Sequence, residues 1–372
     1  PMSRAIALRQ ATLRLAARKG ADLNLISLEA LPNALHPSLQ TAAADARHSL
    51  LLGTSTPGLA RGVAATAAAQ GHGLTVIEPE AALLHAELPD LCAGHNSVTA
   101  VVSDPTNLRI DPRGLNELVA KIAPVDFAGY GALGRRIGER ANATPFIPDN
   151  SVDLVVIDML ANRLTRSEYA DVLAEAFRVL RRHGRLIVIV LAADEPLTVP
   201  RVELGAWAAV RCPLETELSI EVGAAGFHGL TYSALFDRPL QTVKGVELRP
   251  LLFDGYKGKQ GACLDQGHAV IYRGPWSEVH DDDGHRYIRG QRTAVCSKTH
   301  ELLMRAPYRG QFISMPCYAQ VPLEEAPSFD CNTPALRDPA VTKGRVSLFA
   351  KAGSRTAAEC CEPVSDGQPC CP

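Results

Sequence analysis

The segment that most constrains the fold of this chain places a helix between two apolar strands. Val152–Ile157 (VDLVVI) and Arg185–Leu191 (RLIVIVL) are largely aliphatic runs, which is typical of parallel strands covered on both faces. Between them, Thr165–Leu180 has apolar residues at every third or fourth position and leads into RRHG, so that we expect a left-handed C-cap at Gly184. Strands that alternate with helices predict an α/β sandwich.

Further segments continue this alternation towards the N-terminus. Three of them have strand patterns, namely Leu74–Ile77, Val98–Ser103 and Val125–Ala128, and Arg113–Ile122 has helical spacing. We take Leu74–Ile77 as the first strand of the sheet. The sequence therefore predicts a Rossmann-like, doubly wound αβα sandwich.

Changes in composition divide the chain into four parts. Residues 1–48 are expected to form an N-terminal helical segment, and residues 49–240 the sandwich. After residue 240 short strand patterns alternate with turn residues, which predicts a smaller, β-containing α+β region over 241–321. Proline, aspartate, serine and glycine dominate residues 322–372, which predicts an extended cysteine-rich tail.

Charge and hydropathy patterns argue against several kinds of partner. A net charge of -2 and an aromatic content of 5% do not favour nucleic-acid binding. No apolar run is long enough to span a membrane, so that no membrane partner is expected. No secretory signal is recognisable, which favours a cytoplasmic location and reduced thiols. The acids of HDDDGH (His280–His285) predict a hairpin turn rather than a cation site.

The ten cysteines are distributed unevenly along the chain. Cys92 is the only one before Cys212 and is expected to be a small buried hydrophobe. Four others form two adjacent pairs near the C-terminus, Cys360-Cys361 and Cys370-Cys371. Adjacent thiols bridge each other poorly, but both can bind one soft ion. None of the spacings has the repeated CxxC pattern of a structural zinc site.

Three segments carry a resemblance to known families. Pro148–Val190 resembles the central block of S-adenosylmethionine-dependent methyltransferases. Ala262–Gly274 (ACLDQGHAVIYRG) and Thr293–Phe312 (TAVCSKTHELLMRAPYRGQF) are similar to the narrower family of arsenite methyltransferases. Members of that family carry a cysteine before such a strand and a VCxxT segment after it. The resemblance extends over residues 32–312.

The resemblance implies a chemistry in which three cysteine thiolates bind As(III) and S-adenosylmethionine supplies methyl groups. It makes Cys263 and Cys212 the catalytic thiols, and we expect their sulfurs to lie close together. The segment that would supply a third ligand, Leu51–Gly58, has threonine and serine where the family has a thiol. With the VCxxT cysteine and the terminal pairs, the expected ligands of As(III) or another soft ion are Cys212, Cys263, Cys296, Cys360, Cys361, Cys370 and Cys371.

Two alignments of the cofactor site remain open. In the first, EPE at residues 78–80 replaces the glycine-rich loop after the first strand, and Glu78 would meet the methionine ammonium group. Asp104 would then bind the ribose hydroxyls, and Gly129 and Tyr130 would belong to the same site. In the second alignment Leu50–Gly58 is the glycine-rich loop and Glu78 binds the ribose.

The resemblance leaves two functions open. One is a divergent methyltransferase that acts on As(III) or another small thiophilic substrate. The other is a non-methylating relative whose thiols bind a metal or metalloid. Glycines let the backbone approach a cofactor, whereas the side chains of residues 78–82 would fill that space. The first alignment therefore predicts weak binding of S-adenosylmethionine.

Overall fold

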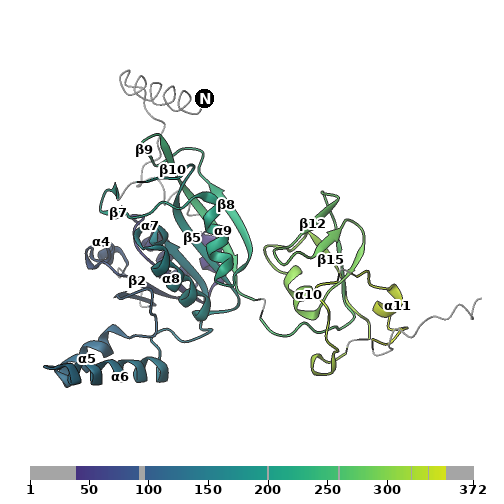
Figure 1. Ribbon diagram of the computed structural model, residues 1–372, viewed down its shortest axis with the longest axis horizontal. Helices are drawn as coiled ribbons and strands as arrows, with labels where there is room; N and C mark the ends of the chain where they lie inside the picture. Colours follow the sequence, from purple (N-terminus) through teal and green to yellow (C-terminus); the bar gives the residue numbers. More distant parts are fainter. Residues whose placement is uncertain are drawn as a thin grey trace, which may run out of the picture. The chain divides into compact units, whose positions relative to one another are not determined.

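The computed structural model describes residues 39–91, 97–198, 201–258, 260–319, 321–333 and 335–348. It divides into two compact units, one up to Lys259 and one from Gln260 onwards (Figure 1). The sequence places this boundary after residue 240, but residues 241–243 and 246–256 are strands of the first unit. Most of the expected N-terminal helical segment, Cys92 and both terminal cysteine pairs lie outside the described residues. None of the described helices is long and apolar enough to cross a membrane.

An eight-stranded sheet forms the centre of the first unit. Its order is β3-β2-β1-β4-β5-β10-β8, with β9 paired to β10. The first five strands in this order are parallel, and β10 is antiparallel to its three neighbours. The bounds are β1 (His48–Leu52), β2 (Gly73–Glu78), β3 (Val98–Val102), β4 (Val152–Asp158), β5 (Leu180–Ala193), β8 (His228–Leu235), β9 (Gln241–Val243) and β10 (Val246–Tyr256).

Helices cover both faces of this sheet. They include α3 (Leu59–Ala69), α4 (Ala81–Leu91), α7 (Leu160–Arg163), α8 (Arg166–Val179) and α9 (Glu215–Ala224). Successive side chains of β1 face opposite ways. Leu51 belongs to the core that contains α3 and α4, whereas Leu50 and Leu52 belong to the core that contains α8 and α9. The predicted Rossmann-like, doubly wound sandwich is thereby confirmed.

The strand order corrects the expected start of the sheet. β1 lies between β2 and β4, so that Leu74–Ile77 belongs to the second strand and not to the first. The first alignment of the cofactor site is therefore wrong, and the loop that follows the first strand is GTSTPG at residues 53–58. β1 has only 5 residues, which is too short for periodicity to distinguish a strand from a loop.

A helical hairpin stands where the sequence predicts a strand at Val125–Ala128. It consists of α5 (Pro112–Ile122) and α6 (Phe127–Ala143). Asp126 caps α6, because its carboxylate accepts a hydrogen bond of 2.7 Å from the backbone amide of Gly129. Val125 is 94% exposed, so that its β-branched side chain does not belong to a buried strand.

The helix and strand of the central block form largely as predicted. α8 begins with a capping box, in which Thr165 and Glu168 bond to each other's backbone amides. β5 starts directly after the helix at Leu180, so that the expected C-cap at Gly184 is wrong. The left-handed residue is His183, with a φ of 68°. A Cβ on Gly184 would lie 3.2 Å from the carbonyl oxygen of Asp153, and the glycine thus lets β4 and β5 approach closely.

The second unit is smaller and contains β-structure, as the sequence predicts. β11 (Ala269–Tyr272) lies between β14 (Arg292–Ala294) and β15 (Phe312–Met315). The HDDDGH segment forms the turn between β12 (Glu278–His280) and β13 (Arg286–Ile288), as expected. The helices of this unit are α10 (Ser297–Leu303), the 3-10 turn η2 (Leu323–Glu325) and α11 (Pro339–Thr342). Its core contains Val270, Tyr272, Tyr287, Val295, Leu302, Leu303 and Phe312.

The described part of the expected tail packs within the second unit. Ser328 forms a β-bridge with Leu264, and Leu336 forms one with Thr293. Residues 321–333 and 335–348 are therefore not an extended segment, because their backbone groups pair with the strands and loops of this unit.

Candidate functional site

Three cysteines of the second unit bring their sulfurs together. The Sγ atoms of Cys263, Cys296 and Cys331 all lie within 4.8 Å of one another. Cys296 is buried, and the other two are half-buried. We call this group the sulfur cluster. Its members precede β11, follow β14 and follow η2, so that the cluster joins three segments that are far apart in the sequence.

Backbone pairing explains why these three segments meet. The amide of Phe329 donates to the carbonyl of Cys263 at 2.9 Å, and the amide of Asp265 donates to the carbonyl of Pro327 at 2.7 Å. On the other side, the amide of Ser297 donates to the carbonyl of Leu264 at 2.9 Å. The loop that carries Cys263 is thus bonded on both sides to the segments that carry the other two cysteines.

A buried ion pair reinforces this arrangement. The guanidinium of Arg337 donates to both carboxylate oxygens of Asp265, at 2.7 and 3.1 Å. The side chains are 9% and 16% exposed, and a two-pronged pair of this kind fixes geometry well. Arg337 Nε also donates to the carbonyl of His268 at 3.2 Å. Residues 327–337 are therefore held beside the Cys263 loop from both ends.

The thiols of Cys263 and Cys331 differ in acidity. Burial alone would raise the pKa of Cys263, but hydrogen bonds from Cys331 and Cys296 and the charge of Lys298 hold it below its ordinary value. Burial and the neighbouring sulfurs raise the pKa of Cys331. Cys296 is the N-cap of α10, where its sulfur accepts a hydrogen bond of 3.4 Å from the amide of Thr299. Cys263 thus ionises more readily than Cys331, and a thiolate is the form that binds metals.

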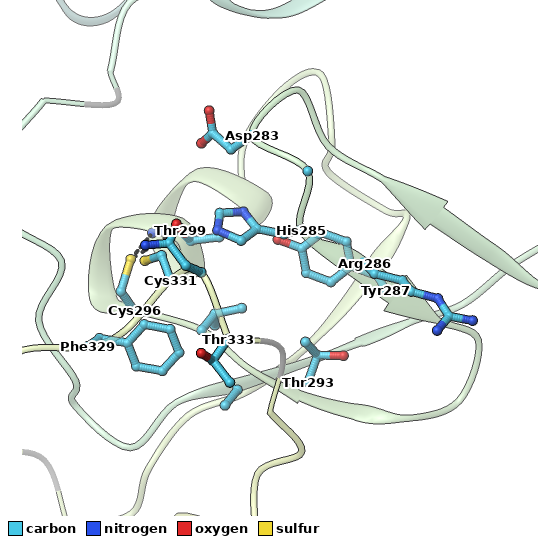
Figure 2. A pocket seen from close by; sticks show the side chains of 14 residues that line it. Asp283, His285, Arg286, Tyr287, Thr293, Cys296, Thr299, Phe329, Cys331 and Thr333 are labelled. Atoms are coloured by element: carbon cyan, nitrogen blue, oxygen red, sulfur yellow. Dashed lines mark hydrogen bonds between the residues drawn. The ribbon is translucent and has the colours of Figure 1, made fainter.

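A cavity of about 120 Å³ opens beside Cys296 and Cys331. Figure 2 shows both sulfurs on one wall, with Phe329 near them and His285 towards the other side. His285 Nδ1 lies 2.8 Å from a carboxylate oxygen of Asp281. That carboxylate also accepts from the amides of its own turn, which is the ordinary role of an aspartate at such a position.

The cysteines predicted from the sequence have different outcomes. Cys263 and Cys296 belong to the sulfur cluster, and Cys331 is a member that the sequence did not indicate. Cys212 lies in the first unit and packs against its core, where burial raises its pKa to about 11. The expected pairing of Cys212 with Cys263 would join the two units and stays a prediction. Cys317 is buried, and its thiol donates to the carbonyls of Ala319 and Val341.

The carboxyl ends of the parallel strands hold a second polar group, centred on Glu78. This residue ends β2, and its side chain is fully buried. The guanidinium of Arg163 donates to its two carboxylate oxygens, at 2.6 and 3.1 Å. Thr54 donates to the same carboxylate through its amide, at 2.7 Å, and through its hydroxyl, at 3.0 Å. Glu78 therefore lies against the loop after β1, as the second alignment requires. Its carboxylate oxygens, however, already accept hydrogen bonds from Arg163 and Thr54.

The loop after β1 is also tied to the end of β4. Thr56 donates to the carboxylate of Asp158 through its amide, at 2.7 Å, and through its hydroxyl, at 2.6 Å. Burial raises the pKa of Asp158 to about 6, although the hydrogen bonds from Thr56 oppose that shift. A Cβ on Gly53 would lie 2.4 Å from the carbonyl oxygen of Asp158. The loop thus lies directly against β4.

The residues at this edge of the sheet do not fit S-adenosylmethionine. A ribose needs a carboxylate with free acceptor positions, and Glu78 has none to offer. Asp104 follows β3, where it accepts from the amide and hydroxyl of Thr106 within its own turn. Gly129 and Tyr130 lie in the first turn of α6 and do not follow a third strand, which removes the reason for placing them in a cofactor site.

Two family models match parts of the chain. Residues 115–188 match a model described as a methyltransferase domain, and residues 259–347 match a domain of unknown function (DUF8838). The second match coincides with the second unit. No curated protein matches this chain.

Solved structures with similar folds include several methyltransferases. One is the arsenic(III) S-adenosylmethionine methyltransferase CrArsM from Chlamydomonas reinhardtii, which is 17% identical, with a TM-score of 0.41, over 81% of this chain and 99% of that chain. Another is the 1,6-didemethyltoxoflavin-N1-methyltransferase of Burkholderia thailandensis, which is 18% identical, with a TM-score of 0.38, over 69% of this chain and 90% of that chain. Residues 115–188, which match the methyltransferase-domain model, belong to the first unit.

Proposed function

We propose that this protein binds a thiophilic trivalent ion, As(III) above all, through the sulfur cluster of its second unit. The observation that carries the proposal is that the three sulfurs lie within 4.8 Å of one another. The pairing of three distant segments and the ion pair of Arg337 with Asp265 hold the cysteines in place before any ion binds. Little rearrangement is then needed, and a prearranged site binds more tightly.

The number of sulfurs favours As(III) over zinc. Soft thiolates select soft centres, and a pyramidal As(III) takes three of them. A structural zinc site has four protein ligands, whereas this group has three members among the described residues. When arsenous acid binds, each thiol replaces one hydroxide. Three As–S bonds form, three As–O bonds break, and the thiol protons leave with the hydroxides as three waters. No oxidant or reductant is required.

We assign the protein to ion binding rather than to methyl transfer. The methyltransferase-domain match and the fold of the first unit favour a methyltransferase origin. The engaged carboxylate of Glu78, however, leaves no acceptor for the ribose of S-adenosylmethionine. The terminal cysteine pairs stay predicted as additional ligands that would deliver the ion to the cluster.

The test uses the full chain with its four terminal cysteines changed to serine. After incubation with arsenite and removal of free arsenic, elemental analysis and native mass spectrometry should find one arsenic per chain. Cys331→Ser should weaken binding by at least about tenfold, which corresponds to about 1.4 kcal/mol. Cys317→Ala is the matched control, because this cysteine lies in the same unit outside the cluster, and it should retain full binding.

The same preparations separate the competing ligand sets. Full binding by Cys331→Ser would contradict the proposal. Loss of binding in Cys212→Ala would instead favour a ligand set that spans both units. Incubation with arsenite and S-adenosylmethionine, followed by separation of the arsenic species, should yield no methylated product. Methylated arsenic would show that the first unit is an active methyltransferase.

A further inference from the structure

Arg163 crosses the carboxyl edge of the central sheet. It is the last residue of α7, which follows β4, and its side chain is 4% exposed. From there the guanidinium reaches Glu78 at the end of β2, 85 residues away in the sequence. It also donates to the hydroxyl of Ser55 at 3.1 Å and to the carboxylate of Glu80 at 2.7 Å. One side chain thus binds the loop after β1, the end of β2 and the segment before α4.

The acceptor positions of Glu78 are fully used by this arrangement. One of its carboxylate oxygens accepts from Arg163 Nη2 and from the amide of Glu80, at 2.6 and 2.8 Å. The other accepts from Arg163 Nη1 and from the amide and hydroxyl of Thr54. A carboxylate offers about four lone-pair positions, and five donors already point at this one. A ligand hydroxyl could bind only by displacing a protein donor.

Further hydrogen bonds hold the loop after β1 at this edge of the sheet. The indole of Trp207, in the hairpin of β6 (Val202–Leu204) and β7 (Trp207–Ala209), donates to the carbonyl of Ser55 at 2.9 Å. Trp207 is 4% exposed. The hydroxyl of Ser55 lies 3.3 Å from the carbonyl of Asp158. Trp207, Asp158 and Arg163 therefore together hold the loop after β1 in place.

We infer that the Arg163 side chain occupies the position where a cofactor would bind. It thereby prevents the first unit from binding nucleoside-type ligands. In open α/β sheets ligands bind outside the carboxyl ends of the strands, where the strand order reverses. In this chain the strand order reverses between β1 and β4. The side chain of Arg163, which follows β4, bonds from there to Glu78. The buried charge pair resists opening, because separation would leave both ions without partners in a site that excludes water.

This inference concerns the first unit, and it stands whether or not the second unit binds As(III). It predicts that removal of the guanidinium opens the site. In Arg163→Ala two of the five donors to Glu78 are removed, and the space of the side chain becomes available. Adenosine and S-adenosylhomocysteine should then bind at least about tenfold more tightly than to the wild-type chain, for which isothermal titration calorimetry should detect no binding.

A second variant guards against loss of folding. Arg163→Lys keeps a positive charge beside Glu78, but an ammonium cannot reproduce the planar fork, so that some acceptors of Glu78 are freed. Arg185→Ala is the matched control, because it breaks another ion pair of the same unit, with the buried carboxylate of Asp254. Circular dichroism selects the variants that fold, and calorimetry is performed on those.

Each outcome decides the inference. Ligand binding gained by a folded Arg163 variant, and not by Arg185→Ala, supports it. Binding of S-adenosylhomocysteine to the wild-type chain at low micromolar concentration would overturn it. Folded Arg163 variants that gain no binding would also overturn it, since the exclusion would then have another cause. The same holds if Arg185→Ala gains equal binding, because general loosening would then explain the effect.

Discussion

Cys331 lies close enough to Cys263 for its thiol to donate a hydrogen bond to a Cys263 thiolate. This bond lowers the pKa of Cys263 and raises that of Cys331 itself. The charge of Lys298, whose ammonium is fixed by the carbonyl of Gly261 at 2.9 Å, acts in the same direction on Cys263. In the ion-free protein Cys263 should therefore react with electrophiles before Cys331 does.

We predict that Cys331→Ala slows alkylation of Cys263 at neutral pH. Loss of the donor raises the pKa of Cys263, and each unit of increase lowers its thiolate fraction about tenfold well below the pKa. Cys331→Ser keeps a hydroxyl donor and should stay near the wild-type rate. Iodoacetamide labelling over a range of pH, read by mass spectrometry of the Cys263 peptide, measures the effect. Equal rates in the wild type and Cys331→Ala would show that this hydrogen bond is not formed.

Individual residues also show which parts of the two sites could be predicted from the sequence. Cys263 and Cys296 stand in recognisable motifs, whereas Cys331 lies in a segment rich in proline, serine and aspartate that gave no sign of packing. Glu78 was assigned to the cofactor site in both alignments. Its partner Arg163 is 85 residues away, and no spacing in the sequence connects the two. Contacts of this kind depend on tertiary structure and leave no local pattern.

At the scale of secondary-structure elements, Thr56 and Asp158 tie the loop after β1 to the end of β4. The Asp158 carboxylate is fully buried, and its pKa is raised from 3.8 to about 6. A carboxyl group with a raised folded-state pKa stabilises the fold fully below its unfolded pKa, and this contribution is lost as the pH rises through the folded pKa. Burial of the ionised Asp158 carboxylate should thus cost stability above about pH 6, although the hydrogen bonds from Thr56 reduce this cost.

We predict that Asp158→Asn changes the pH dependence of unfolding. The free energy of unfolding of the wild type should fall relative to the variant between pH 4 and pH 7, by at most about 3 kcal/mol for a shift of two pKa units. Chemical denaturation at several pH values measures this difference. Asp153→Asn, in the same strand but only partly buried, is the control for the loss of a carboxylate from β4. A constant difference between wild type and Asp158→Asn would rule out a buried carboxyl that titrates near pH 6.

The helix and strands of the central block, which were predicted correctly, have long patterns of apolar residues. α8 has 14 residues and a buried apolar face, and β4 and β5 are nearly continuous apolar runs. β1 was missed because its last residues were assigned to the glycine-containing loop segment Leu50–Gly58. Val125–Ala128 was misread because an N-cap at Asp126 starts a helix within an apolar run. Local capping decided the outcome there against the apparent strand pattern.

At the scale of the whole molecule, the two units use their polar groups differently. In the first unit, the acids at the carboxyl edge of the sheet are satisfied by Arg163, Thr54 and Thr56. In the second unit, three sulfurs lie within 4.8 Å of one another, and two of the cysteines, Cys296 and Cys331, line a cavity of about 120 Å³. The sequence placed the cofactor site in the first unit, and most of the soft-ion ligands, Cys263 and Cys296 among them, beyond it. The structure adds Cys331 to these two, because part of the segment expected to be a tail packs within the second unit.

The sulfur cluster should accordingly depend on where the chain ends. A chain that ends after Leu348 keeps all three cysteines, the Arg337–Asp265 pair and the bridges of residues 327–337, and it should bind one arsenic. A chain that ends after Val321 loses Cys331 and that pairing, so that Cys263 and Cys296 remain and the Cys263 loop is bonded only on the side of Ser297.

We predict that the shorter chain binds arsenite at least about tenfold more weakly. Both chains lack the terminal cysteine pairs, and the comparison therefore isolates residues 322–348. Arsenic per chain after gel filtration gives the stoichiometry, and circular dichroism verifies that the sandwich of the first unit is intact in both. Equal arsenic binding by the two chains would mean that Cys331 and its segment contribute nothing, and that the ligands of As(III) lie elsewhere in the molecule.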